Sequence, residues 1–308
     1  MKLATTTADF YPYLPDKSVA APLTAMPGTP FRHIDMSFYH VIYKDSPWIR
    51  KGDDWKREID DCLAIAEANG YDFIQAHSPD GVHFEEGEKR DALINATVNS
   101  IRACEMLGIR HTVSHAGQSK AFTPTEFIRA NTEFYRLFAD TCEKCNVDIL
   151  TENSAEENMP GYYIRTGHEA AEFVAMAGLP RLHVCWDTGH ANMRGNDPYE
   201  DITALGSELH ALHIQDNHGK YDSHLMPMGG TINFDRVLQG LIDIGFKDYF
   251  TFEGHCSIRH ANNWPHFRND IRPEDRLHTV PLFIQQKQIN VMYEIGKWML
   301  EEYGIFEP

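Results

Sequence analysis

The chain has 308 residues, of which 42% are hydrophobic and 24% are charged, and its formal net charge is −17. This composition is typical of a globular protein with a substantial core, and no apolar run has the length that a membrane helix needs. The acidic balance argues against nucleic-acid binding, which depends on Lys and Arg to neutralise phosphates. We therefore expect neither a membrane nor a nucleic acid among its partners.

The cysteines and the N-terminal residues indicate the cellular compartment in which the protein is expected. Six cysteines in a chain of this length do not form a disulfide framework. Cys142 and Cys145 make a CxxC motif, but it lies inside a helical pattern, so we interpret both as ordinary reduced residues. The segment 1–14 lacks the apolar core of a signal peptide. These features predict a cytoplasmic protein.

Short apolar runs alternate with longer helical patterns along the chain. The predicted strands cover 2–7, 31–39, 71–78, 109–117, 147–153, 181–187, 209–216 and 249–255. The predicted helices cover 54–70, 89–108, 123–145, 233–245 and 281–304. Gly70, Gly108 and Gly245 are stop signals, and Thr123 with Pro124 is a cap followed by proline at the first helical position.

Eight strands that alternate with helices predict a parallel sheet. The number of units matches a (β/α)₈ TIM barrel, and we find no linker or repeat that divides the chain. The prediction is therefore a single α/β barrel domain over residues 1–308. A doubly wound open sheet is the rival, but it usually carries a Gly-rich turn after its first strand, and none is present here.

Every predicted strand from the third onward carries a metal-competent side chain at or near its carboxyl end, where barrel active sites are built. These residues are His77, His115, Glu152, Asp187, His213 and Glu253, with His190 and His255 just beyond the sixth and eighth strands. Burying several carboxylates is costly unless they are neutralised. A divalent cation is the simplest neutralising group.

Glu152, Asp187, His213 and Glu253 come from four consecutive strands and are predicted to bind one divalent ion. Three carboxylates and one imidazole suit Mn²⁺, Mg²⁺, Co²⁺ or Fe²⁺ better than a structural zinc site. We expect Mn²⁺, with Mg²⁺, Co²⁺, Fe²⁺ and Zn²⁺ as alternatives.

Other polar residues near the strand ends are weaker candidates. We predict that five of them contact the substrate: His77, His115, His190, Asp222 and His224. Each histidine is open to a second interpretation as a hydrogen-bonded core residue. The loop 216–230, with Asp216 and His218, is either an ordinary surface loop or part of the site. The segment 261–270, which contains Trp264, Pro265, His266 and Phe267, is either a lid or a peripheral turn.

Four segments resemble the xylose-isomerase-like barrel superfamily. They are "LTEN" (150–153), "WDTGHAN" (186–192), "LHIQDNHGKYDSHLMPMGGTINF" (212–234) and "TFEGH" (251–255). The likeness is strongest to the sugar phosphate isomerase/epimerase group, which also holds ketose 3-epimerases, inositol-catabolism enzymes and endonuclease IV. The resemblance implies a TIM barrel whose metal ligands are Glu152, Asp187, His213 and Glu253, with His190 in contact with the substrate.

The resemblance also implies a function. The expected enzyme is a divalent-metal-dependent isomerase or epimerase of a sugar or polyol derivative, acting by proton abstraction next to a carbonyl through a metal-stabilised enediolate. Glu152 and Glu253 would be the catalytic pair that exchanges this proton. Ketose 3-epimerases place an arginine shortly after the seventh-strand histidine, whereas "HIQDNHGK" (213–220) has none. No basic cluster stands out as a phosphate site, which favours a non-phosphorylated sugar.

Three alternatives remain open. A lyase or dehydratase acting on a keto sugar or keto-inositol, including C-glycoside elimination, would use the same proton abstraction. A non-catalytic sugar-binding barrel, or a subunit that needs a partner chain or a second copy, is another. An endonuclease IV-like nuclease would need nine ligands for three zinc ions, although the net charge opposes binding to a polyanion. The nine candidates are His77, His115, Glu152, Asp187, His190, His213, Asp222, His224 and Glu253.

Overall fold

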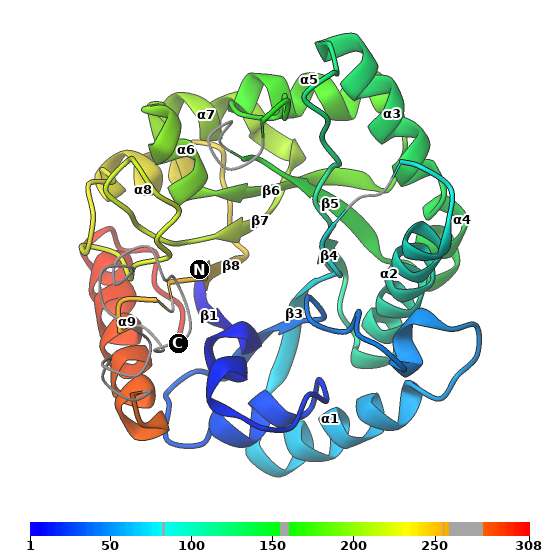
Figure 1. The fold of residues 1–308 in the computed structure, drawn as a ribbon. Helices are drawn as coiled ribbons and strands as arrows, with labels where there is room; N and C mark the ends of the chain where they lie inside the picture. Colours follow the sequence, from blue (N-terminus) through cyan, green and yellow to red (C-terminus); the bar gives the residue numbers. More distant parts are fainter. Residues whose placement is uncertain (82–83, 155–159, 255, 259–279) are drawn as a thin grey trace, which may run out of the picture.

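The computed structural model describes residues 1–308 except for 82–83, 155–159, 255 and 259–279. Eight parallel strands form a barrel in the order β7-β6-β5-β4-β3-β2-β1-β8, with helices on its outside (Figure 1). The strands are β1 Lys2–Thr6, β2 His33–Ser37, β3 Asp72–His77, β4 His111–Val113, β5 Asp148–Glu152, β6 Leu182–Asp187, β7 Leu209–His213 and β8 Tyr249–Phe252. The predicted TIM barrel is confirmed.

The barrel is nearly closed. The first and last strands pair over four residues, from Lys2 with Tyr249 to Thr5 with Phe252. β7 and β8 meet only at their carboxyl ends, where Ile214 N donates to the carbonyl oxygen of Thr251 at 2.8 Å and Glu253 N donates to that of Ile214 at 2.9 Å. The seam between β7 and β8 therefore closes beside the strand ends that carry the candidate site residues.

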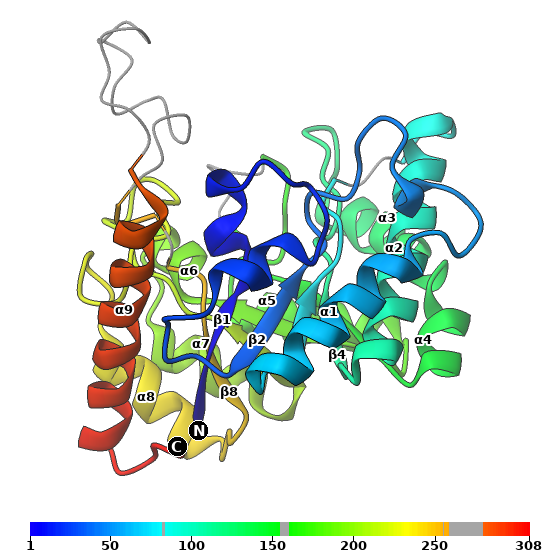
Figure 2. The same cartoon turned by 90° about the horizontal axis from the view of Figure 1, so that it is seen from below.

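Helices follow all but the first strand. They are α1 Lys56–Asn69, α2 Glu88–Leu107, α3 Pro124–Arg136, α4 Ala139–Cys145, α5 Gly167–Ala177, α6 Thr188–Arg194, α7 Pro198–Leu205, α8 Phe234–Asp243 and α9 Leu282–Glu302. Short 3₁₀ helices, Thr7–Tyr13 and Ala21–Ala25, take that place after β1. Both chain termini lie at the end of the barrel where β1 begins (Figure 2). In the described part of the chain, no helix combines the length and apolarity needed to cross a membrane.

The prediction of one continuous helix over 123–145 is wrong, because the structure has two helices there, α3 and α4. The break leaves Leu137 exposed while the next side chain, Phe138, is fully buried. Helix α5 was not identified from the sequence, although Thr166 and Glu169 form a capping box that satisfies its first amide groups. The predicted strand 109–117 is also shorter, because regular pairing ends at Val113.

Two apolar zones hold the barrel together. The larger fills the space between strands and helices and includes the fully buried Trp48, Trp55 and Trp186. The smaller lies separately and consists of Val113, Leu150, Cys185 and Ala211, one residue from each of four consecutive strands. These four residues lie two positions before His115, Glu152, Asp187 and His213. Because alternate strand residues share a face, this inner layer forms the floor beneath the candidate site.

Candidate metal centre and substrate cavity

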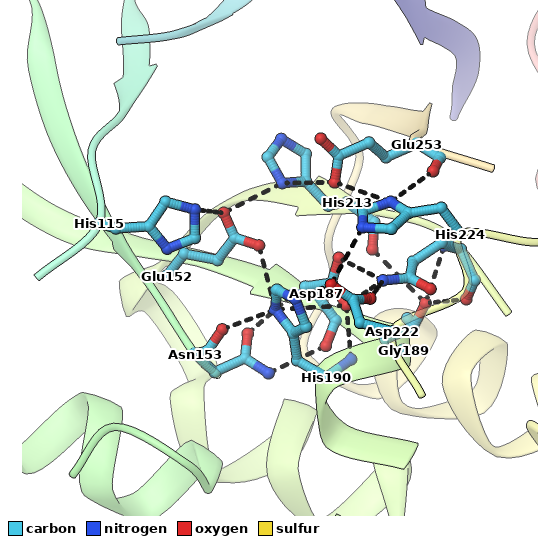
Figure 3. Close-up of polar contacts among 12 residues, drawn as sticks. His115, Glu152, Asn153, Asp187, Gly189, His190, His213, Asp222, His224 and Glu253 are labelled. Carbon is cyan, nitrogen blue, oxygen red and sulfur yellow. Dashed lines mark hydrogen bonds and ion pairs between the residues drawn. The ribbon is translucent and has the colours of Figure 1, made fainter. Parts of the chain in front are cut away.

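A cavity of about 430 Å³ lies at the carboxyl-terminal end of the barrel. Seven of the nine predicted site residues line it: His77, His115, Glu152, His190, Asp222, His224 and Glu253. The other two, Asp187 and His213, are completely buried next to them. The structure therefore brings all nine predicted residues together, as Figure 3 shows for eight of them.

The four predicted metal ligands form one group. Glu152, Asp187, His213 and Glu253 each offer a ligand atom, and these atoms all lie within 4.8 Å of one another. His213 Nδ1 lies 3.2 Å from Glu152 Oε2 and 3.6 Å from Glu253 Oε2. Both His213 Nδ1 and Glu152 Oε2 are buried, and neither has a hydrogen-bond partner among the described residues. Buried lone pairs that converge in this way fit a divalent cation.

Asp187 also begins a helix. Its side chain is the N-cap of α6, and Oδ1 accepts a hydrogen bond from the backbone N–H of His190 at 2.6 Å (Figure 3). The strand thus ends in a carboxylate that both caps a helix and faces the group of ligands. Burial raises the pKa of Asp187 to about 6 against the opposing effect of His190. Position 189 of this helix requires glycine, because a Cβ there would lie 2.2 Å from the side chain of Gln215.

A second group consists of His190, Asp222 and His224, whose ligand atoms also lie within 4.8 Å of one another. His190 Nε2 and His224 Nε2 lie 3.2 and 3.1 Å from the same atom, Asp222 Oδ2. The Nδ1 atoms of the two rings lie 2.8 Å from the carbonyl oxygen of Asn153 and 2.9 Å from that of Glu253. Metal-binding histidines usually donate their second nitrogen to such an acceptor, which fixes the tautomer.

His77, His115 and Glu152 form a third group. The Nε2 atoms of the two histidines face each other at 3.3 Å, and they lie 3.8 and 3.5 Å from Glu152 Oε2. His77 Nδ1 lies 2.8 Å from the carbonyl oxygen of Ser78. Glu152 is shared with the group of four, so the three groups are continuous around one cavity.

The histidines control the charge of the two glutamates. Burial opposes ionisation, but His213 and His115 hold the pKa of Glu152 well below its usual range. Burial likewise opposes ionisation of Glu253, and His213 with His224 lowers its pKa. Both glutamates are therefore carboxylates at neutral pH.

Other predicted residues stay outside the cavity. His218 is exposed and is not among the described residues that line the cavity. Asp216 instead holds the loop together, because its carboxylate accepts hydrogen bonds from the backbone of Asn217, Gly230 and Ile232. The predicted lid over 261–270, with Trp264 to Phe267, and His255 lie outside the described residues.

Sequence reasoning missed Asp35 and Gln215. Asp35 on β2 is buried, and its Oδ2 lies 3.9 Å from His213 Nε2. Gln215 Nε2 donates to Asp222 Oδ1 at 2.7 Å and lies 3.3 Å from Asp187 Oδ1, so it links two of the groups. An available signal was Asp35 itself, a carboxylate between the apolar Ile34 and Met36 inside the predicted strand "FRHIDMSFY" (31–39).

A sequence profile described as xylose isomerase-like TIM barrel matches residues 34–272. Fructoselysine 3-epimerase of Escherichia coli O157:H7 is 23% identical over 190 residues, which cover 61% of this chain and 65% of that enzyme. The match to D-psicose 3-epimerase of Enterocloster bolteae is shorter, with 26% identity over 112 residues, which cover 36% of this chain and 35% of that enzyme. The chain therefore spans less than two thirds of these curated relatives.

A solved structure of a D-tagatose 3-epimerase-like protein superposes with a TM-score of 0.71 over 98% of each chain, at 18% identity. At these identities the likeness is one of fold. The profile match extends from β2 through β8 and so includes every predicted metal ligand. The chain belongs to the xylose isomerase-like TIM barrel family.

Proposed function

We propose that this protein is a divalent-metal-dependent isomerase or epimerase of a non-phosphorylated sugar or polyol derivative. The observation that carries the proposal is the group of three carboxylates and His213 beside a cavity with no Lys or Arg among its described lining residues. The relatives named as sugar epimerases support the same chemistry. A cytoplasmic location belongs to the proposal, since none of the six cysteines, all of them described in the structure, forms a disulfide.

Glu152, Asp187, His213 and Glu253 would hold the metal. When bound, a divalent cation would polarise a substrate carbonyl and stabilise the negative charge that develops when the adjacent carbon loses its proton. Mn²⁺ remains our proposal for the ion, because carboxylate-rich sites suit it. A solved structure described as IOLI protein with a binding zinc atom, at 17% identity and a TM-score of 0.69 over 98% of this chain and 99% of that one, keeps zinc as the alternative.

Glu152 and Glu253 would exchange the proton. Both are ionised at neutral pH, and both line the cavity. Their Oε2 atoms lie 3.2 and 3.6 Å from His213 Nδ1. Two carboxylates so placed can reach a substrate carbon from different sides, which is what inversion at one carbon requires.

The cavity wall indicates the substrate class. Its polar groups include Tyr39, His40 and Asp80 in addition to the site residues, and its volume is in the range of small-molecule sites. Asp80 accepts a hydrogen bond from Tyr39 at 2.9 Å. Neutral hydroxyl groups can be bound by such side chains, whereas a phosphate would need cationic or backbone N–H partners. His77, His115, His190, Asp222 and His224 are proposed to contact these hydroxyl groups when they hold no cation.

A lyase or dehydratase acting on a keto sugar is the alternative within the same chemistry. It would use the same base to remove the proton next to the carbonyl, and a leaving group would then depart from the neighbouring carbon. Product analysis separates the two, because elimination changes the composition of the sugar and epimerisation does not.

An endonuclease IV-like nuclease is favoured by a different observation. The nine candidate ligands fall into three groups of three or four, which is the arrangement that three metal ions would need. The net charge of −17 and the absence of Lys and Arg from the described cavity wall oppose a polyanionic substrate. We therefore rank this function below both the isomerase or epimerase and the lyase.

Incubation with a panel of keto sugars in D₂O, followed by NMR, tests the proposal. We expect deuterium at the carbon next to the carbonyl of the accepted sugar. The Glu152→Gln and Glu253→Gln variants should each lose at least about 10²–10⁴-fold in rate, because a general base is removed. Glu301→Gln, an exposed change on α9, serves as the matched control. Turnover without deuterium incorporation would contradict the roles of both glutamates as bases.

A further inference from the structure

The barrel carries a second set of metal-competent side chains at its amino-terminal end. Along β5, Asp148, Leu150 and Glu152 share one face because they alternate. Leu150 belongs to the inner apolar layer, so Asp148 lies on the opposite side of that layer from Glu152. His111 takes the same position on β4, two residues before Val113.

A β-bulge adds His210 to this set. Leu209 and Ala211 pair with consecutive residues of β6, which leaves His210 without a partner in the ladder. A bulge of this kind redirects a side chain. His210 Nδ1 lies 3.7 Å from Asp148 Oδ2, and His111 Nδ1 lies 3.6 Å from the same oxygen.

Three ligand atoms therefore converge below the apolar layer. His111 Nδ1, Asp148 Oδ2 and His210 Nδ1 lie within 4.8 Å of one another. Both nitrogen atoms are buried and have no hydrogen-bond partner among the described residues. Asp148 Oδ1 accepts a hydrogen bond from Arg181 Nη1 at 3.1 Å, which leaves Oδ2 for the two rings. We propose that His111, Asp148 and His210 form a second, structural site for a divalent transition metal.

The charges suit a metal of the zinc class. Burial, together with the neighbouring His210, lowers the pKa of His111 to about 4, so this ring is neutral at pH 7. Two imidazoles and one carboxylate favour Zn²⁺ or Co²⁺ over Mg²⁺ and Ca²⁺, which prefer oxygen ligands. Arg181 pairs with Glu143 as well as with Asp148, because Glu143 Oε2 lies 3.1 Å from Arg181 Nε. Arg181 therefore does not neutralise Asp148 alone.

The surroundings provide support and an adjacent cavity. The ring of His183 stacks on that of His210, with centroids 3.7 Å apart, and His183 Nδ1 lies 2.9 Å from Glu208 Oε2. Such packing orients a ligand ring. A cavity of about 210 Å³ lies beside the cluster and is lined by His111, His210 and Asp248, and also by Arg110.

A cation here would tie β4, β5 and β7 together. β4 has only three residues, so its pairing contributes few hydrogen bonds. An ion that binds the folded state and not the unfolded chain stabilises the fold by linkage. This role is independent of the reaction at the other end of the barrel, so the two proposals can fail separately.

The test is zinc content together with anomalous diffraction. Metal-free protein is loaded with excess ZnCl₂, passed through gel filtration and measured by elemental analysis. We expect His111→Gln and His210→Gln each to hold one zinc per chain less than the wild type. His168→Gln, an exposed change on α5, is the matched control and should keep the wild-type content.

Crystals of the zinc-loaded wild type should give an anomalous peak between His111, Asp148 and His210, and Asp187→Asn crystals should keep that peak. Circular dichroism identifies a variant that fails to fold. In that case the anomalous map of the zinc-loaded wild type tests the proposal. Equal zinc content in wild type and folded His111→Gln, or anomalous peaks confined to the carboxyl-terminal end of the barrel, would overturn the proposal.

Discussion

The Nε2 atom of His213 lies 3.9 Å from Asp35 Oδ2, and both side chains are almost completely buried. The other nitrogen of His213 faces Glu152 and Glu253. A proton on Nε2, directed at Asp35, leaves the lone pair on Nδ1 free for a metal. Asp35 is therefore placed to select the tautomer of the one imidazole in the group of four ligands.

Asp35→Asn tests this relationship. Loss of an outer-shell carboxylate typically weakens metal binding by about 10–100-fold, and we expect an effect of that size in a chelator competition assay. Asp60→Asn, an exposed change on α1, should leave the affinity unchanged. Wild-type affinity in folded Asp35→Asn would show that His213 is oriented by other contacts.

Asp187→Asn separates the two roles of Asp187. Asparagine is as good an N-cap as aspartate, so α6 should remain and circular dichroism should match the wild type. Metal content should nevertheless fall sharply, because a charged ligand is lost. Asp187→Ala should in addition lose about 0.5–2 kcal/mol of stability with the cap. Undiminished metal content in Asp187→Asn, measured by elemental analysis, would contradict its assignment as a ligand.

Metal binding should release protons. Burial alone would lower the pKa of His213, but the neighbouring Cys185, Glu253 and Glu152 raise it well above its usual range. This ring therefore carries a second proton at neutral pH, and a cation bound at Nδ1 would have to displace it. Apparent affinity should therefore increase with pH above about 6.5, the ordinary pKa of histidine.

Calorimetric titrations in buffers of different ionisation enthalpy measure that release directly. The same pKa shift contributes to the stability of the metal-free protein. A histidine with a raised pKa stabilises the fold below its unfolded pKa, and this contribution disappears as pH rises through the folded value. Binding enthalpies that do not depend on the buffer would show that the His213 ring is already neutral.

The proposed sugar enzyme and the endonuclease IV-like nuclease differ in their behaviour toward DNA. We expect no cleavage of an abasic-site duplex at physiological salt, because the protein has a net charge of −17. A gel assay with zinc-loaded protein checks this. Efficient cleavage that declines steeply with added salt would reverse our ranking of the two functions.

The strand pattern predicted the barrel and most strand positions, because alternation of apolar runs and helices is visible in the chain. It also predicted where Glu152, Asp187, His213 and Glu253 would meet, since parallel strands deliver their carboxyl ends to one edge. Helix α6 was not predicted, because seven residues are too few for a clear periodic pattern. Asp35 was missed because its role depends on a contact with His213, 178 positions further along the chain.

The His111 cluster was missed for a related reason. His210 joins Asp148 through a bulge in β7, and an irregular ladder cannot be read from a pattern of period two. The chain contains 17 histidines, but which of them lie toward either end of the barrel is evident only once the inner layer of Val113, Leu150, Cys185 and Ala211 is known.

The pairing of β1 with β8 has a consequence for synthesis of the protein. Residues 2–5 hydrogen-bond with residues 249–252, so the first strand has no partner on one edge until the last strand has been translated. Chain elongation proceeds at about 5–20 residues per second, which leaves that edge exposed for roughly 12–50 seconds. During this interval the nascent chain presents an open parallel sheet, and chaperones that cover strand edges would act on it before the barrel closes.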